Sequence, residues 1–391
     1  MIKHLAPFAL VLAIVPNAGA AADKPAFTLP PYAGAYQPQG KDERGLWMEL
    51  DEQERQFRDA PAILHQPKLT EFVRGVLCRT VGEDRCGSTR VYVVQDASMN
   101  AAMAPNGEML VHTGLLARVH SEAELATVLG HEFAHFERRH TLQHFRALRR
   151  ATDWVAWLSL GGVVTRTPVA SAQSSIVGAV FQFQRFEEEE ADRLSTQFVR
   201  ASPYRLRASI VWKRAMEEND ALRTERGLRR VQHLVPTLTD THPTDLQRFT
   251  YLSQIEAEAG DAGEDGVDRY KAATDPLLPL LFQPLIKGND FAAADYVIRS
   301  RGEALGWDGP LLTIRGELYR ERGNPRDLVA ARDMFEHASA QSNAPAEAWR
   351  GLGLCALRLG DADAGRKAIA EYVKRAPSAP DVAILKSLLE S

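Results

Sequence analysis

One stretch of the sequence decides the fold: residues 121–138 read SEAELATVLGHEFAHFER. Ser121 is followed three residues later by Glu124, and this capping box marks the start of a helix. The apolar residues that follow, from Leu125 to Phe133, recur at helical spacing and predict a long amphipathic helix. The second half of this expected helix carries two histidines.

His131 and His135 are four residues apart on the expected helix. Positions i and i+4 lie on one face of a helix, so two imidazoles can converge on one metal ion. Glu132 beside them is expected to act as the general base on a metal-activated water, the arrangement of a zinc hydrolase. The alternative is a pair of structural histidines on a partly buried helix.

A third metal ligand is expected from a second long helix, predicted over residues 175–200. Its centre, residues 185–192, reads RFEEEEAD. Four successive glutamates by themselves are typical of a solvated helix face. A catalytic zinc ion usually takes three protein ligands, so beside a two-histidine motif a carboxylate on a facing helix is a natural third donor. Asp192 lies four residues after Glu188, on the same side of the helix.

The two motifs, His131-Glu132-x-x-His135 and Glu188-x-x-Ala191-Asp192, resemble the gluzincin metallopeptidases of the HtpX, CAAX prenyl protease and BepA type. The resemblance covers roughly residues 42–255. It implies that His131, His135 and Glu188 hold one Zn²⁺ ion per chain, and that Asp192 holds a ligand histidine in its tautomer.

Shorter segments share the resemblance. They are Asn100-Ala101, Thr113–Leu116, Glu122–Ala126, and Thr241-His242-Pro243 with Arg248. The resemblance therefore makes His242 and Arg248 candidates for a supporting or regulatory role. The sequence departs from the family at Ser195, where glycine is common, and at Gln184, where serine is frequent. Neither departure touches an expected ligand.

His242 has two interpretations of equal weight. On the family's His-Pro loop it can approach the metal, occupy the position of the water and so act as a latch. Alternatively, it is a turn histidine that bonds to nearby backbone. Replacement of His242 by alanine is expected to raise peptidase activity under the first interpretation.

Secondary-structure signals predict a mainly helical fold with a small β-sheet. The resemblance implies that this is an α+β zincin-type peptidase domain. Strands are expected at residues 91–94 and 109–112, the second after an Asn106-Gly107 turn. Amphipathic helices are expected at residues 42–58 and 68–79. The predicted divisions are a signal peptide (1–20), an extended arm (21–41), the peptidase domain (42–256), a linker (257–271) and helical repeats (272–391).

The C-terminal part resembles tetratricopeptide repeats. In its last unit Trp349, Leu352, Gly353, Gly360 and Pro377 fall at the spacing of that repeat. Earlier units match less closely, and a plain helical bundle is the alternative. The exported, soluble members of the resembled family also join a peptidase to such repeats.

The N-terminus predicts export. Lys3 and His4 precede an apolar run over residues 5–15 and an Ala18-Gly19-Ala20 site, the pattern of a signal peptide cleaved after Ala20. The expected location is the periplasm. Because that compartment is oxidising, Cys78 and Cys86 are candidates for a disulfide.

Composition narrows the possible functions. The 391 residues include 47 Lys+Arg and 51 Asp+Glu, which gives a net charge of −4. This balance argues against a general nucleic-acid binder, which needs a basic surface. No apolar segment reaches the roughly 20 residues of a transmembrane span.

Together the motifs and the signal pattern predict a zinc-dependent endopeptidase of the bacterial cell envelope. The resemblance implies that it cleaves misfolded or unassembled proteins. Residues 109–112 are expected to form an edge strand that pairs with an extended peptide substrate. The resemblance implies outer-membrane assembly components as further partners, bound through the repeats. The alternative is an exported chaperone-like scaffold with a closed zinc site, but a scaffold has no need of Glu132. A zinc hydrolase of non-peptide substrates gains no support from the resemblance.

Overall fold

The computed structural model describes residues 37–147, 149, 185–229 and 245–390. All of the described residues belong to one compact unit. The predicted signal peptide, residues 21–36 of the predicted arm, and His242 therefore lie outside the described residues.

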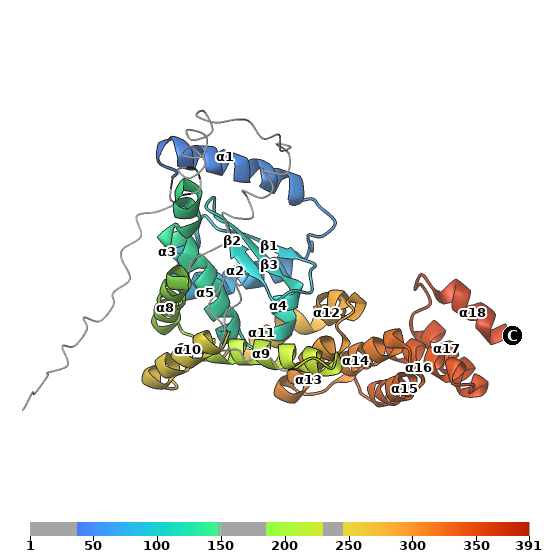
Figure 1. The fold of residues 1–391 in the computed structure, drawn as a ribbon. Coiled ribbons are helices and arrows are strands. Elements are labelled where there is room, and N and C mark those ends of the chain that lie inside the picture. Colours follow the sequence, from blue (N-terminus) through green and yellow to red (C-terminus); the bar gives the residue numbers. More distant parts are fainter. Residues whose placement is uncertain (1–36, 148, 150–184, 230–244, 391) are drawn as a thin grey trace, which may run out of the picture. The chain divides into compact units, whose positions relative to one another are not determined.

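The described chain is mainly helical with a small sheet, which confirms the predicted fold class (Figure 1). Its first helices are α1 (Gly40–Phe57), α2 (Pro67–Val81), α3 (Glu83–Cys86), α4 (Thr113–Arg118), α5 (Glu122–Arg138), α8 (Arg185–Ala201) and α9 (Ala208–Glu225). The later ones are α10 (Asp245–Ala259), α11 (Val267–Thr274), η1 (Asp275–Leu277), α12 (Leu278–Lys287), α13 (Phe291–Leu305), α14 (Gly309–Arg322), α15 (Pro325–Ser339), α16 (Ala346–Arg358), α17 (Ala362–Arg375) and α18 (Val382–Glu390).

The sheet contains β1 (Arg90–Val94), β2 (Ala101–Met103) and β3 (Glu108–His112) in the order β1-β3-β2. β3 pairs parallel with β1 and antiparallel with β2, so it is the central strand. The prediction that residues 109–112 form an edge strand is wrong. β2 has only three residues and gave no strand signal, yet it forms the hairpin with β3 and takes the edge position.

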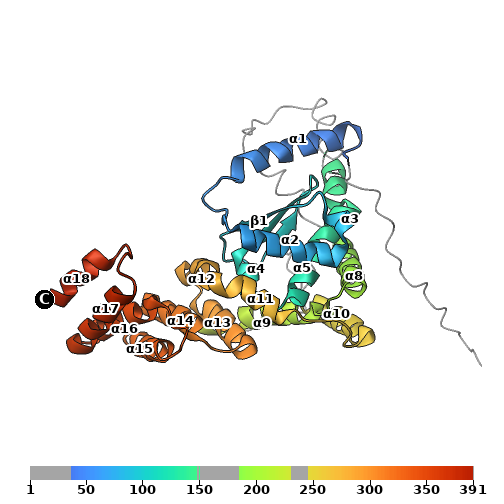
Figure 2. The same cartoon turned by 180° about the vertical axis from the view of Figure 1, so that it is seen from behind.

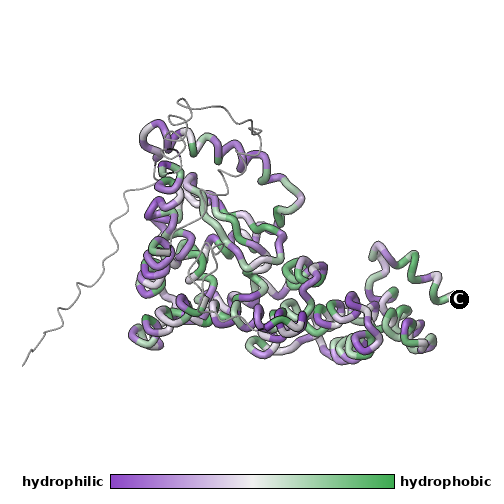
Figure 3. Tube along the Cα trace, viewed as in Figure 1, coloured by the Kyte–Doolittle hydropathy of each residue, from purple (hydrophilic) through white to green (hydrophobic). Residues whose placement is uncertain are grey.

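The sheet is covered by helix α2, which lies in front of it in Figure 2. Alternate residues of the strands, including Val93, Met109 and Val111, are fully buried. Figure 3 shows the corresponding hydrophobic stretches of the strands. Burial of these side chains stabilises the sheet, and its strand β2 packs against α5, the helix that carries both histidines.

Helices α5 and α8 pack side by side (Figure 1). A Cβ atom added at Gly130 would come within 2.9 Å of Ser195 Oγ, so glycine allows the close approach. Ser195 Oγ donates a hydrogen bond to the carbonyl of Thr127 at 2.7 Å. The position where the resembled family has glycine therefore lies within the contact between the two helices.

Helix α1 is tied to the sheet through Glu54. Its carboxylate accepts hydrogen bonds from Arg90 Nε at 2.5 Å and from the Tyr92 hydroxyl at 2.8 Å, both on β1. Leu46 and Leu50 of the same helix join a small apolar cluster with Ala104 and Leu142. The amphipathic helix predicted at residues 42–58 thus packs on the domain that follows it.

Residues 260–266, part of the predicted linker, are hydrogen-bonded to the loop between α8 and α9 and to the start of α5. The Glu264 amide donates to the Pro203 carbonyl, and the Glu264 carbonyl accepts from the Arg205 amide, both at 2.9 Å. The Asp265 carbonyl accepts from the Ala123 amide at 3.1 Å, in the first turn of α5. The domain boundary stays a prediction, but this segment supports the start of the histidine helix.

The later helices α14 to α17 pack in succession, each against the next (Figures 1 and 2). Gly323, at the end of α14, and Gly360, between α16 and α17, adopt positive φ, which suits the turns between antiparallel helices. Such hairpins are what a tetratricopeptide repeat requires, although the repeat type stays a prediction.

Cys78 and Cys86 form a disulfide that joins α2 to α3, with 5.1 Å between their Cα atoms. Cys355 is a buried free thiol, and burial raises its pKa to about 11. Within the described ranges, none of the helices combines the length and apolar character that a bilayer crossing requires.

Candidate metal centre

The position of helix α5 follows from its capped start. Ser121 Oγ accepts a hydrogen bond from the Glu124 amide at 3.2 Å, and the Glu124 carboxylate accepts from the His120 amide at 2.7 Å. These two bonds satisfy amides at the helix start that lack helical partners, close to the pattern of a capping box. Leu125, Leu129 and Phe133 are fully buried along the apolar face. The opposite side of the last turns presents His131 and His135 to α8.

Three residues with donor atoms meet between α5 and α8. His131 Nε2 and His135 Nε2 are 3.1 Å apart, and they lie 3.5 and 3.4 Å from the two carboxylate oxygens of Glu188. All three residues are buried: His131 is 6% exposed, His135 2% and Glu188 0%. The structure thus brings the three predicted ligands together in one cluster.

This donor set fits zinc. Zinc takes imidazole nitrogen and carboxylate oxygen at about 2.0–2.2 Å in tetrahedral geometry, which places neighbouring donors roughly 3.3 Å apart. The three separations in the structure lie close to that value. The residues present therefore fit a zinc ion with three protein ligands.

Behind the donors, Asp192 orients His131. Its Oδ1 lies 2.8 Å from His131 Nδ1, on the side of the ring away from Glu188. Arg248 from α10 donates to both carboxylate oxygens of Asp192, with Nε to Oδ2 at 2.8 Å and Nη2 to Oδ1 at 2.5 Å. The pair is bidentate and buried, which holds the carboxylate in one orientation.

Two further side chains support this pair. The Tyr251 hydroxyl donates to Asp192 Oδ2, and the Arg248 guanidinium carbon lies 3.6 Å from the centre of the Trp212 ring. Sequence reasoning missed both residues. Tyr251 is three residues after Arg248 on the same helix face, a spacing that could have identified it. Trp212 lies on α9 and no local pattern connects it with the centre.

The charges around the two histidines differ. Burial and Arg248 act to lower the pKa of His131, but attraction to Asp192 outweighs them and raises that pKa to about 9. Burial and the neighbouring charge of His131 lower the pKa of His135 to about 2. Burial opposes ionisation of Asp192, yet Arg248 and His131 hold its pKa well below the usual range. The carboxylates that attract a proton to His131 attract a metal cation equally.

Glu132 is partly exposed and follows the first ligand histidine on α5. It does not join the buried donor cluster. Its expected role as general base on a metal-activated water stays a prediction.

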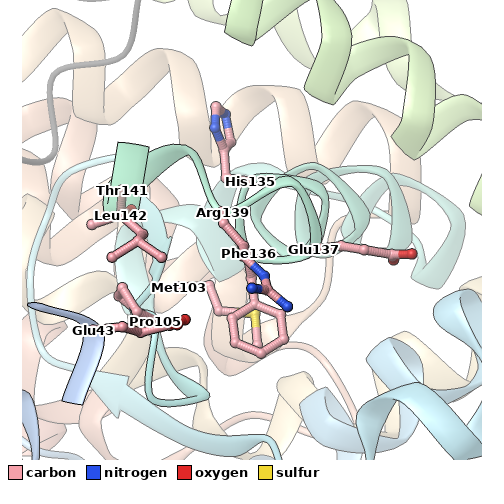
Figure 4. A pocket seen from close by; sticks show the side chains of 9 residues that line it. All are labelled: Glu43, Met103, Pro105, His135, Phe136, Glu137, Arg139, Thr141 and Leu142. Atoms are coloured by element: carbon pink, nitrogen blue, oxygen red, sulfur yellow. The ribbon is translucent and has the colours of Figure 1, made fainter. Parts of the chain in front are cut away.

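A small cavity of 60 Å³ lies beside the centre (Figure 4). It is lined by Glu43, Met103, Pro105, His135, Phe136, Glu137, Arg139, Thr141 and Leu142. In Figure 4 the His135 ring points away from Met103 and Phe136. The cavity therefore lies behind the ring of His135.

Two histidines that sequence reasoning did not single out follow α5. His140 Nδ1 lies 2.9 Å from His135 Nδ1, and His144 Nε2 lies 2.6 Å from Glu187 Oε2. His140 thus connects the chain after α5 with the expected ligand His135, and His144 connects it with Glu187 on α8. A histidine five residues after His135 would not face it on a continuous helix, so helical spacing gave no signal.

Comparisons with known proteins agree with this geometry. Residues 65–256 match peptidase family M48. The chain is 26% identical over 162 residues to the beta-barrel assembly-enhancing protease of Yersinia pestis. The aligned segment covers 38% of this chain and 33% of that protein. It is 24% identical over 160 residues to the Escherichia coli K12 protein of the same name. This alignment also covers 38% of this chain and 33% of that protein.

A second group of relatives is mitochondrial. The chain is 30% identical over 217 residues to the metalloendopeptidase OMA1 of Danio rerio. The aligned segment covers 52% of this chain and 44% of that protein. The chain thus spans about a third of the length of the two bacterial relatives and less than half of the zebrafish one. The matches confirm the predicted family resemblance.

Proposed function

Because residues 65–256 match peptidase family M48, we propose that this chain is a zinc-dependent endopeptidase with its active site between α5 and α8. One observation carries the proposal: His131, His135 and Glu188 converge in a buried cluster with zinc-like spacing. Glu132, the expected general base, follows directly on the same helix.

His131, His135 and Glu188 would hold the ion. When bound, zinc supplies Lewis acidity, which makes a water molecule nucleophilic near neutral pH. Glu132 takes a proton from the attacking water and passes it to the leaving amine. Asp192 keeps the proton of His131 on Nδ1, so that Nε2 stays available as a donor.

We propose that β2 guides the substrate. The Ala104 amide donates to the Glu108 carbonyl and the His112 amide to the Asn100 carbonyl, so even-numbered residues of this segment face β3. In an antiparallel ladder the alternate residues, Ala101 and Met103, then direct their backbone groups away from β3. Among the described residues no strand pairs with that side of β2. An extended peptide can add there by main-chain pairing.

The location and partners follow from the sequence and the relatives. We propose that the chain acts in the cell envelope, on proteins that are misfolded or unassembled. The N-terminal signal pattern supports export, and the beta-barrel assembly-enhancing proteases among the relatives support a link to outer-membrane assembly. The helical hairpins after residue 309 offer a surface for such partners.

The decisive experiment is Glu132→Gln. The amide keeps the size of the side chain but cannot accept a proton, so casein cleavage should fall by about 10²–10⁴-fold. Zinc content should stay at one ion per chain, because Glu132 is not a ligand. Glu189→Gln is the matched control, since this exposed glutamate of α8 pairs with Arg193.

A result with zinc retained and cleavage lost, beside an active control, would support the peptidase. If Glu132→Gln cleaves casein like the wild type, the proposed role of Glu132 fails. If the wild type binds zinc and cleaves no protein, the closed-site scaffold becomes the better account.

A further inference from the structure

His140 occupies a buried position behind the second ligand histidine. It is 2% exposed, and its Nδ1 lies 2.9 Å from His135 Nδ1. On the other side of its ring, Nε2 lies 3.5 Å from Glu190 Oε2. Glu190 also pairs with Arg138 Nε at 3.0 Å, at the end of α5. These contacts form a line from His135 through His140 to a carboxylate of α8.

The backbone between the two histidines is unusual. Arg139 has φ 58° and ψ 36°, and among the described non-glycine residues it alone has positive φ. The left-handed conformation costs a non-glycine residue about 1–2 kcal/mol. It ends α5 after Arg138, and helical structure resumes at residue 140. The turn brings His140 back against His135, which a continuous helix would not do.

The donor positions determine where the protons lie. His135 Nε2 faces His131 Nε2 and Glu188, so this nitrogen needs a lone pair to bind an ion. The proton of a neutral His135 ring is then on Nδ1 and must be donated to His140 Nδ1. His140 accepts there, carries its own proton on Nε2, and directs that proton toward Glu190.

We propose that His140 is a positioning residue for the metal: it fixes the tautomer and ring orientation of His135, and Glu190 in turn fixes His140. This inference rests on the proposed zinc site. It gives His135 the same kind of support that Asp192 gives His131. Outer partners of metal-binding histidines typically contribute 10–100-fold to metal affinity.

The test is zinc affinity, measured by competition with a chromophoric chelator. Asparagine and leucine at position 140 have similar size, but only the asparagine oxygen can accept the proton of His135. His140→Leu should weaken zinc binding by about 10–100-fold, and His140→Asn should recover most of that loss. His144→Leu is the matched control, because His144 pairs with Glu187 between the same two segments.

Each outcome has a distinct meaning. If the wild type fails to bind zinc, the proposed function falls. If the wild type binds zinc and His140→Leu binds it within about twofold of the wild type, only the role of His140 falls. The proposal is also overturned if His140→Asn binds zinc as weakly as His140→Leu does. The same holds if the control His144→Leu binds zinc as weakly as these two variants.

A measurement on the unsubstituted protein covers the case in which His140→Leu does not fold. Long-range proton–nitrogen NMR of the zinc-loaded protein reports the tautomer of each histidine ring. We expect His135 with its proton on Nδ1 and His140 with its proton on Nε2. Zinc on Nδ1 of His135, or a proton on Nδ1 of His140, would contradict the proposal.

Discussion

Asp192 contacts three side chains at once: the ring of His131, the guanidinium of Arg248 and the hydroxyl of Tyr251. Its own side chain is buried, and so is that of Arg248. A buried charge without a partner costs several kcal/mol, so each ion of this group depends on the other. The same carboxylate therefore contributes to the fold and to the orientation of a ligand histidine.

The replacement Asp192→Asn separates these two effects. The amide keeps the shape but leaves Arg248 buried with a weaker partner, so the free energy of unfolding should fall by about 3 kcal/mol or more. Urea unfolding of the metal-free protein measures this loss, and chelator competition measures zinc affinity. An unchanged unfolding free energy would show that Asp192 does not balance the charge of Arg248.

Glu108 gives the fold a dependence on pH. It is buried at the start of β3, and burial together with the nearby charge of Glu54 raises its pKa to about 7, against the opposing effect of Arg90. The folded protein therefore keeps the Glu108 proton over a range in which the unfolded chain, with a pKa near 4.5, has lost it. Stability should fall as pH rises from 4.5 to 7.

The measurement is urea unfolding at several pH values for the wild type and Glu108→Gln. Glutamine has no proton to lose, so the variant should gain stability relative to the wild type as pH rises, by on the order of 3 kcal/mol at pH 8. A constant difference between the two proteins over this range would rule out the raised pKa.

At the scale of elements, local sequence patterns predicted the features that depend on neighbouring residues alone. The capping box and apolar spacing identified α5, and the i, i+4 rule placed His131 and His135 on one face. Glu188 was distinguished from its neighbouring glutamates only through the family resemblance. The order of the strands depends on pairing between distant segments, so the central position of β3 escaped prediction. His140 escaped because its contact depends on one left-handed residue, Arg139.

The edge position of β2 predicts different effects for proline at two neighbouring positions, 101 and 102. Ala101→Pro removes an amide that points away from β3, whereas Ala102→Pro removes one that the ladder needs. Ala101→Pro should therefore keep the fold and zinc affinity but lose most casein cleavage. Ala102→Pro should lower the melting temperature. Wild-type cleavage by a folded Ala101→Pro would exclude peptide pairing at this edge.

At the scale of the whole molecule, the segment with linker composition supports α5, the helix that carries His131 and His135. The Asp265 carbonyl accepts from the Ala123 amide, and Arg269 Nη2 pairs with the buried Glu122 at 2.6 Å. Tyr270 is fully buried and its hydroxyl donates to the Leu116 carbonyl at 2.5 Å. Glycines and acids at residues 257–267 indicated a boundary, but composition does not reveal which backbone groups are paired.

Two shortened chains test where the peptidase part ends. A chain that stops at Ala259 loses Asp265, Arg269 and Tyr270, and the loss of the buried tyrosine alone should cost about 3–5 kcal/mol. A chain that stops at Leu305 keeps α11, which packs on α2 and α5, and also α12 and α13, which pack on α4 and α9. The longer chain should therefore bind zinc with the affinity of the full protein, and the shorter one should bind it more weakly and unfold at a lower temperature. Equal zinc affinity and equal unfolding for both chains would instead place the boundary where the composition of the sequence puts it, before α11.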